Sequence, residues 1–315
     1  MDEIFGILME QMGLFLFYMI VGVILVKVHV LAKDTLETLS RFVMKLAMPV
    51  MIFINTVGGV DRDSLVHSLS VLGLAVVFYV CTFLISKGLS VLFHLKGDRA
   101  SVYRALSMFG NIGFMGIPII SSVFPEQGML YISVFTIIDQ LVLWTLGVKL
   151  TTPGGQGSFQ PKKMINPCTV AVVLALLMVV SGLSLPPLLH TALDKIGGTA
   201  TPLAMIYLGG VFACMDVKTY VRVREFYGIV VVKMMVFPVL LYMACGFLPI
   251  DESVRLTFAL LAAMPAMSSI VMMAKASGSE GDYAMGGIFV TTVCSIVSIP
   301  AVFWVLQQVA QTMKV

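Results

Sequence analysis

The run Phe109-Gly-Asn-Ile-Gly-Phe-Met-Gly-Ile-Pro118 lies inside one of the long apolar segments of this chain. Its three glycines and one proline oppose a regular helix, because proline removes a backbone donor and glycine has a low helix propensity. If the segment crosses a membrane, the backbone groups freed by the break must be buried in protein or line a cavity. The run therefore predicts a membrane helix that is interrupted near mid-depth.

The composition indicates that such spans extend along the whole chain. Of 315 residues, 59% are hydrophobic and only 12% are charged, whereas soluble proteins carry roughly a quarter charged residues. A helix needs ~20 apolar residues to cross a bilayer, and segments of about that length recur between short polar stretches. We therefore expect an all-α membrane protein with ten transmembrane helices. The segments lie at residues 5–29, 36–57, 65–93, 100–124, 128–150, 167–184, 190–214, 226–249, 253–275 and 283–310.

Lysine and arginine residues gather in every second loop between these segments. By the positive-inside rule, the basic loops face the cytoplasm. We therefore expect a multi-pass protein of the cell (inner) membrane, with both termini outside and a cytoplasmic linker at residues 151–166. The basic loops hold Lys27 and Lys33, Lys87 through Arg104, Lys149 through Lys163, and Lys218 through Arg224.

The linker divides the predicted spans into five before it and five after it. Because five is odd, the second half must enter the membrane from the opposite side. We expect residues 1–150 and 167–315 to form two inverted five-helix repeats, with helices 4 and 9 broken by prolines at equivalent positions. Paired interrupted helices of this kind mark the central site of many transporters. The matched tripeptides are Ala47-Met-Pro49 with Ala200-Thr-Pro202, and Gly116-Ile-Pro118 with Ala263-Met-Pro265.

The two predicted breaks supply candidate binding groups. Free N–H groups at the start of a half-helix favour an anion such as a carboxylate. The Asn111 amide and the Ser268 and Ser269 hydroxyls could donate to that carboxylate, or could instead satisfy backbone groups at the breaks. The predicted substrate site comprises Gly110, Asn111, Gly113, Pro118, Pro265, Ser268, Ser269 and Asn55, which closes the second span.

Charged residues inside the predicted spans are a further set of candidates. Asp139 is near mid-depth, where a carboxylate is a functional candidate as a proton carrier or cation ligand; the alternative is a structural partner for a lysine or backbone donor. Lys45, Lys233 and Lys275 lie nearer the cytoplasmic ends, where long side chains reach water. Lys45 stands one turn before Pro49 and could reach an inner vestibule. Asp139 and Lys45 are therefore the candidates for proton or ion coupling.

Several classes of function lack their usual motifs. The five cysteines form no C-x-x-C pair and the histidines stand at no ligand spacing, so we expect no metal site and no cofactor. The 23 methionines are scattered, which favours helix packing over a soft-metal pathway. There is no phosphate-binding loop and no protease or esterase motif, so we do not expect an enzyme. A net charge of +3, not gathered on one face, argues against nucleic-acid binding.

Three motifs resemble the auxin efflux carrier family, which includes plant PIN-type carriers and bacterial permeases for malate or malonate. They are Ala47-x-Pro49 with Asn55, the run from Phe109 to Pro118, and Ala263-Met-Pro-Ala-Met-Ser-Ser269. The resemblance covers essentially the whole chain. It implies a scaffold and a transport domain in a ten-helix fold, crossing helices 4 and 9, an elevator-like motion and homodimers as in plant relatives.

The resemblance also assigns roles and exposes differences. Asn111, Pro118 and Pro265 match the asparagine and prolines of the crossover. The middle loop is short, so regulation through a long phosphorylated loop is not expected. The distantly similar bile-acid sodium symporters use acidic and amide ligands, whereas the ninth span here offers serines and methionines, which argues against sodium coupling.

Together these observations predict a secondary carrier for a small organic anion, such as a mono- or dicarboxylate. Its expected partners are that anion, the lipid bilayer and a second copy of the chain. Alternating access would occur around the two breaks, and Asp139 would supply any proton coupling. A sodium-coupled symporter, a gated pore for organic anions and a membrane metabolite sensor remain the alternatives.

Overall fold

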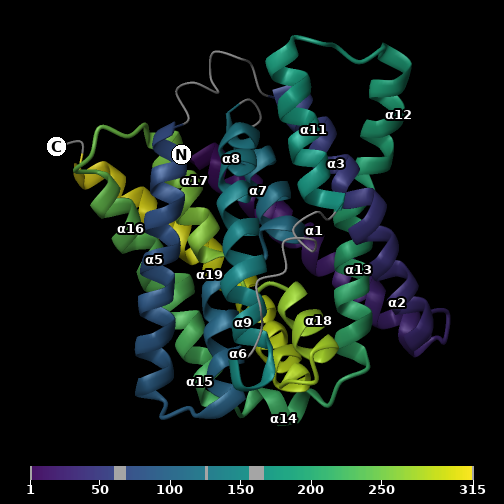
Figure 1. Cartoon of the computed structure of the whole chain (residues 1–315), viewed down its shortest axis with the longest axis vertical. Coiled ribbons are helices and arrows are strands. Elements are labelled where there is room, and N and C mark those ends of the chain that lie inside the picture. Colours follow the sequence, from purple (N-terminus) through teal and green to yellow (C-terminus); the bar gives the residue numbers. More distant parts are fainter. Residues whose placement is uncertain (1, 60–68, 125–126, 156–166, 314–315) are drawn as a thin grey trace.

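The computed structural model describes residues 2–59, 69–124, 127–155 and 167–313, and these ranges are almost wholly helical (Figure 1). Most of the expected linker, residues 156–166, lies outside the described residues. The expectation of an all-α membrane protein is confirmed, because seven helices in the described ranges are long and apolar enough to cross a bilayer. They are Ile4–Lys27, Asp34–Gly58, Val71–Leu92, Leu130–Thr151, Pro187–Ala213, Arg224–Cys245 and Gly281–Thr312.

The other expected spans are shorter or interrupted, so the count of ten stays a prediction. The first half contains α1 (Asp2–Lys27), α2 (Lys33–Phe42), η1 (Val43–Ala47), α3 (Met48–Gly59), α5 (Leu69–Leu92), α6 (Gly97–Met108), η2 (Ile112–Gly116), α7 (Ile117–Val123), α8 (Gly128–Val142), η3 (Leu143–Gly147), α9 (Val148–Thr151) and η4 (Pro153–Gly155). The second half contains α11 (Pro167–Ser181), α12 (Pro187–Gly198), α13 (Ala200–Ala213), α14 (Val217–Val221), α15 (Arg224–Gly228), η5 (Ile229–Val236), α16 (Phe237–Cys245), α17 (Glu252–Ala263), α18 (Ser269–Ala276) and α19 (Gly281–Met313).

Three prolines each follow a π-helical turn. The π-helices η1, η2 and η5 each end two residues before a proline, which is Pro49, Pro118 and Pro238 respectively. A proline has no N–H and clashes with the carbonyl four residues earlier, so a regular α-turn cannot precede it without strain. A wider turn relieves that clash, and such turns are common at functional sites. The prolines thus explain where these helices are distorted.

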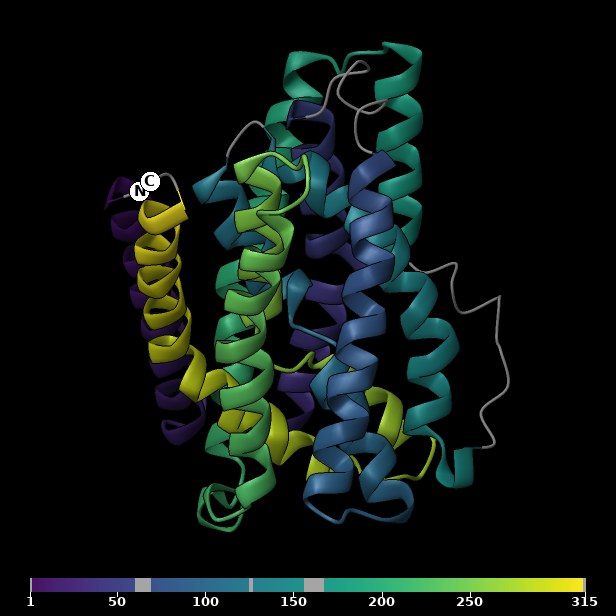
Figure 2. The ribbon, with the colours of Figure 1, turned by 90° about the vertical axis from the view of Figure 1, so that its left-hand side faces the viewer.

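The helices form two groups that face each other. The first group holds α1, α2, α3 and α11 to α13, in which α1 packs along α13 and α3 packs along α11. The second group holds α5 to α9 and α14 to α19, in which α5 packs on α6 and α8, and α17 on α16. Figures 1 and 2 show that α5, α8 and α13 run roughly along the long axis of the molecule.

An aromatic cluster holds the second group together. The Phe78 ring on α5 lies 5.2 Å from Phe135 of α8, 5.6 Å from Phe237 of α16 and 6.3 Å from Phe258 of α17, measured between ring centroids. Rings at these separations interact favourably beyond the area that they bury. The cluster therefore joins four helices from both halves of the chain into one packed unit.

The helix ends near the two termini and the basic connections lie at opposite ends of the molecule. The start of α1 and the end of α19 lie side by side (Figure 2). The Phe5 and Phe303 rings of these two helices stack with centroids 6.4 Å apart. The connection from α5 to α6 and the segment α14–α15, both rich in basic residues, lie at the other end (Figure 1). There Arg99 donates to the Glu225 carboxylate at 2.6 Å.

Glycines allow close approach of α1 and α13. A Cβ atom on Gly22 would lie 2.1 Å from the carbonyl oxygen of Ile206, and one on Gly209 would lie 2.0 Å from that of Met19. Small residues at such positions let membrane helices pack backbone to backbone. Gly22 and Gly209 are therefore packing residues rather than hinges.

We expect Gly22→Ala to destabilise the protein by about 1–3 kcal/mol, because the added methyl group would overlap the α13 backbone. Thermal unfolding of detergent-solubilised protein measures the effect. Gly13→Ala is the matched control in the same helix, since a Cβ at Gly13 meets nothing within 4 Å. Equal unfolding midpoints for the two variants would contradict the close packing.

Candidate functional site

The two helix breaks cross and pair with each other. The first break separates α6 from η2 at residues 109–111, and the second separates α17 from α18 at residues 264–268. The backbone N–H of Asn111 donates to the carbonyl of Pro265 at 2.7 Å, and that of Met267 donates to the carbonyl of Phe109 at 2.9 Å. These bonds form an antiparallel β-bridge between Gly110 and Ala266. Each break thus satisfies polar groups that the other exposes.

Gly110 permits this crossing. A Cβ atom at Gly110 would lie 3.2 Å from Cβ of Met264 and 3.4 Å from the carbonyl oxygen of Leu261, which is tighter than most Cβ contacts. Pro265 suits the partner position, because its backbone only accepts a hydrogen bond there. Gly110 and Pro265 therefore build the crossing itself and do not line the cavity beside it.

Asn111 divides its side chain between two roles. Its Oδ1 accepts a hydrogen bond from the N–H of Phe114 at 3.3 Å and so caps η2. Its Nδ2 has no hydrogen-bond partner among the described residues, although the side chain is only 2% exposed. A buried amide without a partner is costly unless something else binds it. The oxygen is thus structural, whereas the amide N–H groups are free for a ligand.

A cavity of about 430 Å³ lies beside the crossing, between the two groups of helices. It brings together six of the predicted site residues: Asn111, Gly113, Ser268, Ser269, Asp139 and Lys45. Its other linings come from α2, η1, α3, η2, α7, α8, η3, the start of α11, and α18 with the residues before it.

Two predicted site residues lie elsewhere. Asn55 and Pro118 line a second cavity of about 270 Å³, together with Asp194 of α12 and Thr201 of α13. Asn55 lies one and a half turns beyond Pro49 along α3, and Pro118 lies on the far side of η2 from Asn111. The structure therefore does not bring them together with Asn111, Ser268 and Ser269.

Sulfur atoms form much of the wall of the first cavity. Cys168 Sγ approaches Met48 Sδ at 3.6 Å. Methionines adapt to irregular shapes because they are unbranched and polarizable. The methionines look scattered in the sequence, yet these gather at one site and give it an adaptable apolar wall. The lining methionines are Met44, Met48, Met267, Met272 and Met273.

Asp139 is held by side chains of two helices. It is 2% exposed, accepts a hydrogen bond from the Tyr79 hydroxyl of α5, and accepts a second from Gln140 Nε2 at 3.1 Å. Trp144 Nε1 in turn donates to Gln140 Oε1 at 3.1 Å. In the part of the chain that the structure describes, Asp139 makes neither an ion pair with a lysine nor a hydrogen bond with a backbone donor. Tyr79 is thus a site residue that the sequence analysis missed.

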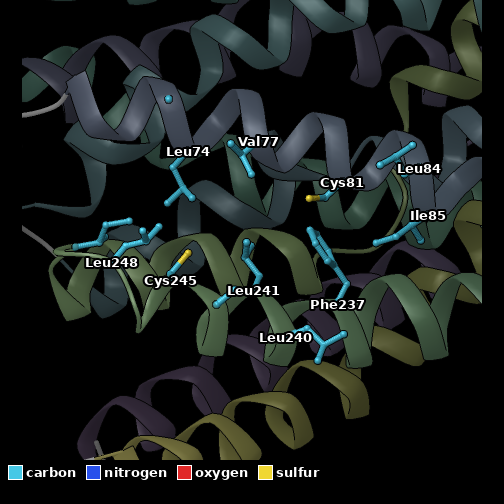
Figure 3. A pocket seen from close by; sticks show the side chains of 13 residues that line it. Leu74, Val77, Cys81, Leu84, Ile85, Phe237, Leu240, Leu241, Cys245 and Leu248 are labelled. Atoms are coloured by element: carbon cyan, nitrogen blue, oxygen red, sulfur yellow. The ribbon is translucent and has the colours of Figure 1, made fainter.

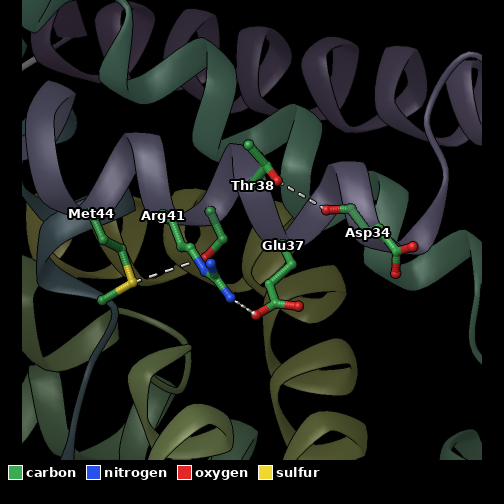
Figure 4. A network of polar contacts seen from close by, with 6 residues as sticks. Asp34, Glu37, Thr38, Arg41 and Met44 are labelled. Atoms are coloured by element: carbon green, nitrogen blue, oxygen red, sulfur yellow. Dashed lines mark hydrogen bonds and ion pairs between the residues drawn. The ribbon is translucent and has the colours of Figure 1, made fainter.

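Charged side chains of α2 make polar contacts with their neighbours (Figure 4), and two of them, Glu37 and Arg41, line the cavity. Glu37 and Arg41 form an ion pair one turn apart on α2. Lys45, one turn further on, is exposed and makes no ion pair with any described residue. Among the described residues that line this cavity, Lys45 is therefore the cation without an ion-pair partner.

The prediction that the Lys233 side chain reaches water is wrong. Its side chain is 0% exposed, and its Nζ donates to the carbonyl of Met264. The expectation was wrong because η5 packs against α16, α17 and α19, which cover the lysine. Lys275, by contrast, is exposed and pairs with Asp282 at 3.2 Å.

Thr291 is a second site residue that the sequence analysis missed. Its Oγ1 accepts a hydrogen bond from the N–H of Ala266 at 3.1 Å.

A larger cavity lacks the chemistry of a binding site. The groove between α5 and α16, of about 600 Å³, is lined by apolar side chains together with Cys81 and Cys245 (Figure 3). Specific ligand sites combine an apolar wall with a few convergent polar groups. Because this groove offers none, the cavity at the crossing is the candidate functional site.

Comparison with known proteins agrees with this arrangement. The sequence profile of the membrane transport protein family matches residues 7–160 and residues 156–304. The chain belongs to this family of membrane transport proteins. The resemblance to the auxin efflux carriers is thereby confirmed.

Two archaeal relatives of this membrane transport protein cover most of its length. An uncharacterized transporter of Methanocaldococcus jannaschii is 23% identical over 292 residues, which is 88% of this chain and 92% of the relative. An uncharacterized transporter of Methanothermobacter thermautotrophicus is 26% identical over 291 residues, which is 89% and 92% of the two chains. The chain is therefore similar to transporters along nearly its whole length.

A double-mutant cycle tests the pairing of Tyr79 with Asp139. We expect Tyr79→Phe and Asp139→Asn to show a coupling energy of about 0.5–3 kcal/mol in thermal or chemical unfolding, because the two side chains share one buried hydrogen bond. The double variant should then be less destabilised than the sum of the single variants. Simple additivity within about 0.3 kcal/mol would contradict the contact.

Proposed function

We propose that this membrane transport protein is a secondary carrier for a small organic anion, such as a mono- or dicarboxylate. The observation that carries the proposal is the partnerless amide of Asn111 at the edge of the cavity. An amide N–H can donate to a carboxylate oxygen, and hydrogen bonds to charged groups are stronger than those between neutral groups. A bound anion would complete the hydrogen bonding of the crossing.

Helix ends favour an anion at the same place. The half-helices that start with η2 and α18 both begin at the crossing, so their N-terminal ends and partial positive charges meet there. Ser268 and Ser269 stand at the start of α18, and Ser268 makes no side-chain cap bond. The exposed ammonium of Lys45 adds a positive charge at the cavity. Asn111, Ser268, Ser269 and Lys45 would therefore bind the anionic group.

Ten spans in two inverted repeats account best for the packing. The family profile matches each half of the chain once. Helix α1 of the first half packs on α13 of the second, and α3 packs on α11, which is the exchange expected from a two-fold related pair of repeats. Residues 1–150 and 167–315 would be these repeats, joined by the linker at 151–166.

The two groups of helices suit an elevator mechanism. The first group would serve as the scaffold, and the second group, which carries both breaks and the aromatic cluster, would move as the transport domain. The basic end of the molecule would face the cytoplasm by the positive-inside rule, which places both termini outside a cell (inner) membrane. A homodimer formed through the scaffold is part of the same proposal.

We expect Asn111→Asp to weaken carboxylate binding about 10-fold or more, because it replaces the free amide by a negative oxygen while keeping the oxygen that caps η2. Counterflow in proteoliposomes, with labelled malate, malonate and indole-3-acetate as probes, measures binding and carriage together. A pore would show no counterflow.

Asn55→Asp is the matched control, because Asn55 lines the other cavity. We expect it to transport like the unaltered protein. If the two variants transport equally well, Asn111 does not bind the substrate. If none of the carboxylates gives saturable counterflow, the proposed class of substrate is wrong.

The role of Asp139 in proton coupling has a separate test. We expect Asp139→Asn to abolish the stimulation of uptake by a pH gradient, because an amide cannot take up a proton, while counterflow without a gradient persists. Asp282→Asn is the control, since Asp282 is an exposed carboxylate that does not line the cavity. Gradient-driven uptake that survives in Asp139→Asn would exclude the proton role.

A further inference from the structure

Lys233 is a charged side chain that the proposed site does not use. Of the charged side chains in the described ranges, only Lys233 and Asp139 are buried. None of the ion pairs within these ranges involves Lys233, and its Nζ donates instead to the backbone carbonyl of Met264. A lysine deep in a membrane protein is expensive and is usually kept for a function.

The ammonium group lies where two helices end. Helix α6 ends at Met108 and α17 ends at Ala263, so the carbonyl ends of both half-helices meet behind the crossing. A Cβ atom on Gly110 would lie 3.4 Å from Lys233 Nζ and 3.4 Å from the carbonyl oxygen of Leu261. Helix C-terminal ends carry partial negative charge and favour a cation. Lys233 therefore places its positive charge against the negative ends of both half-helices.

Neighbouring helices complete the second break from both sides. Lys233 of η5 binds the carbonyl of Met264, and Thr291 of α19 accepts from the N–H of Ala266, two residues further along. The Met264 carbonyl has no backbone donor among the described residues. Without Lys233, this carbonyl would lack a hydrogen-bond partner among the described residues.

In ion-driven carriers, the coupling cation is bound by carbonyl groups of unwound segments and by the C-terminal ends of half-helices. We propose that the Lys233 ammonium is a built-in cation at this position, so that the crossing holds its shape without a bound sodium ion. One consequence of the inference, that transport does not depend on sodium, rests on the proposed carrier function. The structural role of Lys233 does not rest on it. Lys233 acts as a positioning residue, because it holds the second break and does not line the cavity.

Thermal unfolding of the purified protein tests the structural part without any substrate. We expect Lys233→Ala to lower the unfolding midpoint by about 5–10 °C, because the Met264 carbonyl loses a charged donor. Methylammonium or propylammonium should restore part of that loss, whereas choline at equal ionic strength should not. Lys233→Met should be destabilised without rescue, because it fills the space but has no donor.

Lys45→Ala and Lys275→Ala are the matched controls, since both lysines are exposed. We expect neither variant to lose stability or to respond to the alkylammonium ions. Lys233→Ala with an unchanged midpoint, or with no response to the small amines, would overturn the proposal.

The unaltered protein allows a test that does not depend on whether a variant folds. Its midpoint is expected to be the same in sodium chloride and in choline chloride, and a rise that is specific to sodium would overturn the inference. Counterflow is expected at equal rates in the two salts. Counterflow that requires sodium would refute the role of Lys233 as a built-in cation, but not the proposal that the protein is a carrier. Absence of counterflow in both salts would refute the carrier proposal, but not the result on stability.

Discussion

The fold depends on one constraint, which is that a polar backbone group inside a membrane needs a partner. Each break alone would expose N–H and C=O groups that its own helix cannot satisfy. The bonds from Asn111 to Pro265 and from Met267 to Phe109 solve this for both breaks at once. The crossing can form only if the two halves of the chain meet at this point, and Gly110 allows the close approach that this requires. The packing of both groups of helices follows from this meeting.

Hydrogen bonding at the crossing also explains where a ligand can bind. Lys233 satisfies the carbonyl of Met264, Thr291 satisfies the N–H of Ala266, and the oxygen of Asn111 satisfies the N–H of Phe114. The Asn111 amide has no partner among the described residues, and Asn111 lines the cavity. A binding group is thus what remains after the breaks have been stabilised. The Asn111 side chain both caps η2 and offers donors to a ligand. A substitution at Asn111 can therefore test ligand binding without disturbing the helix only if it keeps the oxygen that caps η2.

The two buried charges lie on different sides of this arrangement. Asp139 lines the cavity and is held by Tyr79 and Gln140, so a ligand or proton that enters the cavity can reach it. Lys233 lies behind the crossing, against helix ends and away from the cavity lining. A carboxylate that faces the cavity can change its protonation during a transport cycle, whereas a cation fixed to the backbone can serve throughout it. The adaptable methionine wall gives the same cavity tolerance for the apolar part of a ligand.

The sequence by itself determined the membrane class, the positions of the breaks and several site candidates. These follow from apolar content, proline and glycine, which are local properties of the chain. Asn111, Ser268 and Asp139 could be singled out because they are polar within apolar segments. Only the tertiary structure showed that Tyr79 binds Asp139, 60 residues away, and that Lys233 binds Met264, 31 residues away. It also placed Asn55 and Pro118 in a different cavity. The physical reason is that such partners are chosen by which helix faces come together, and one segment carries no information about the face that another segment presents to it.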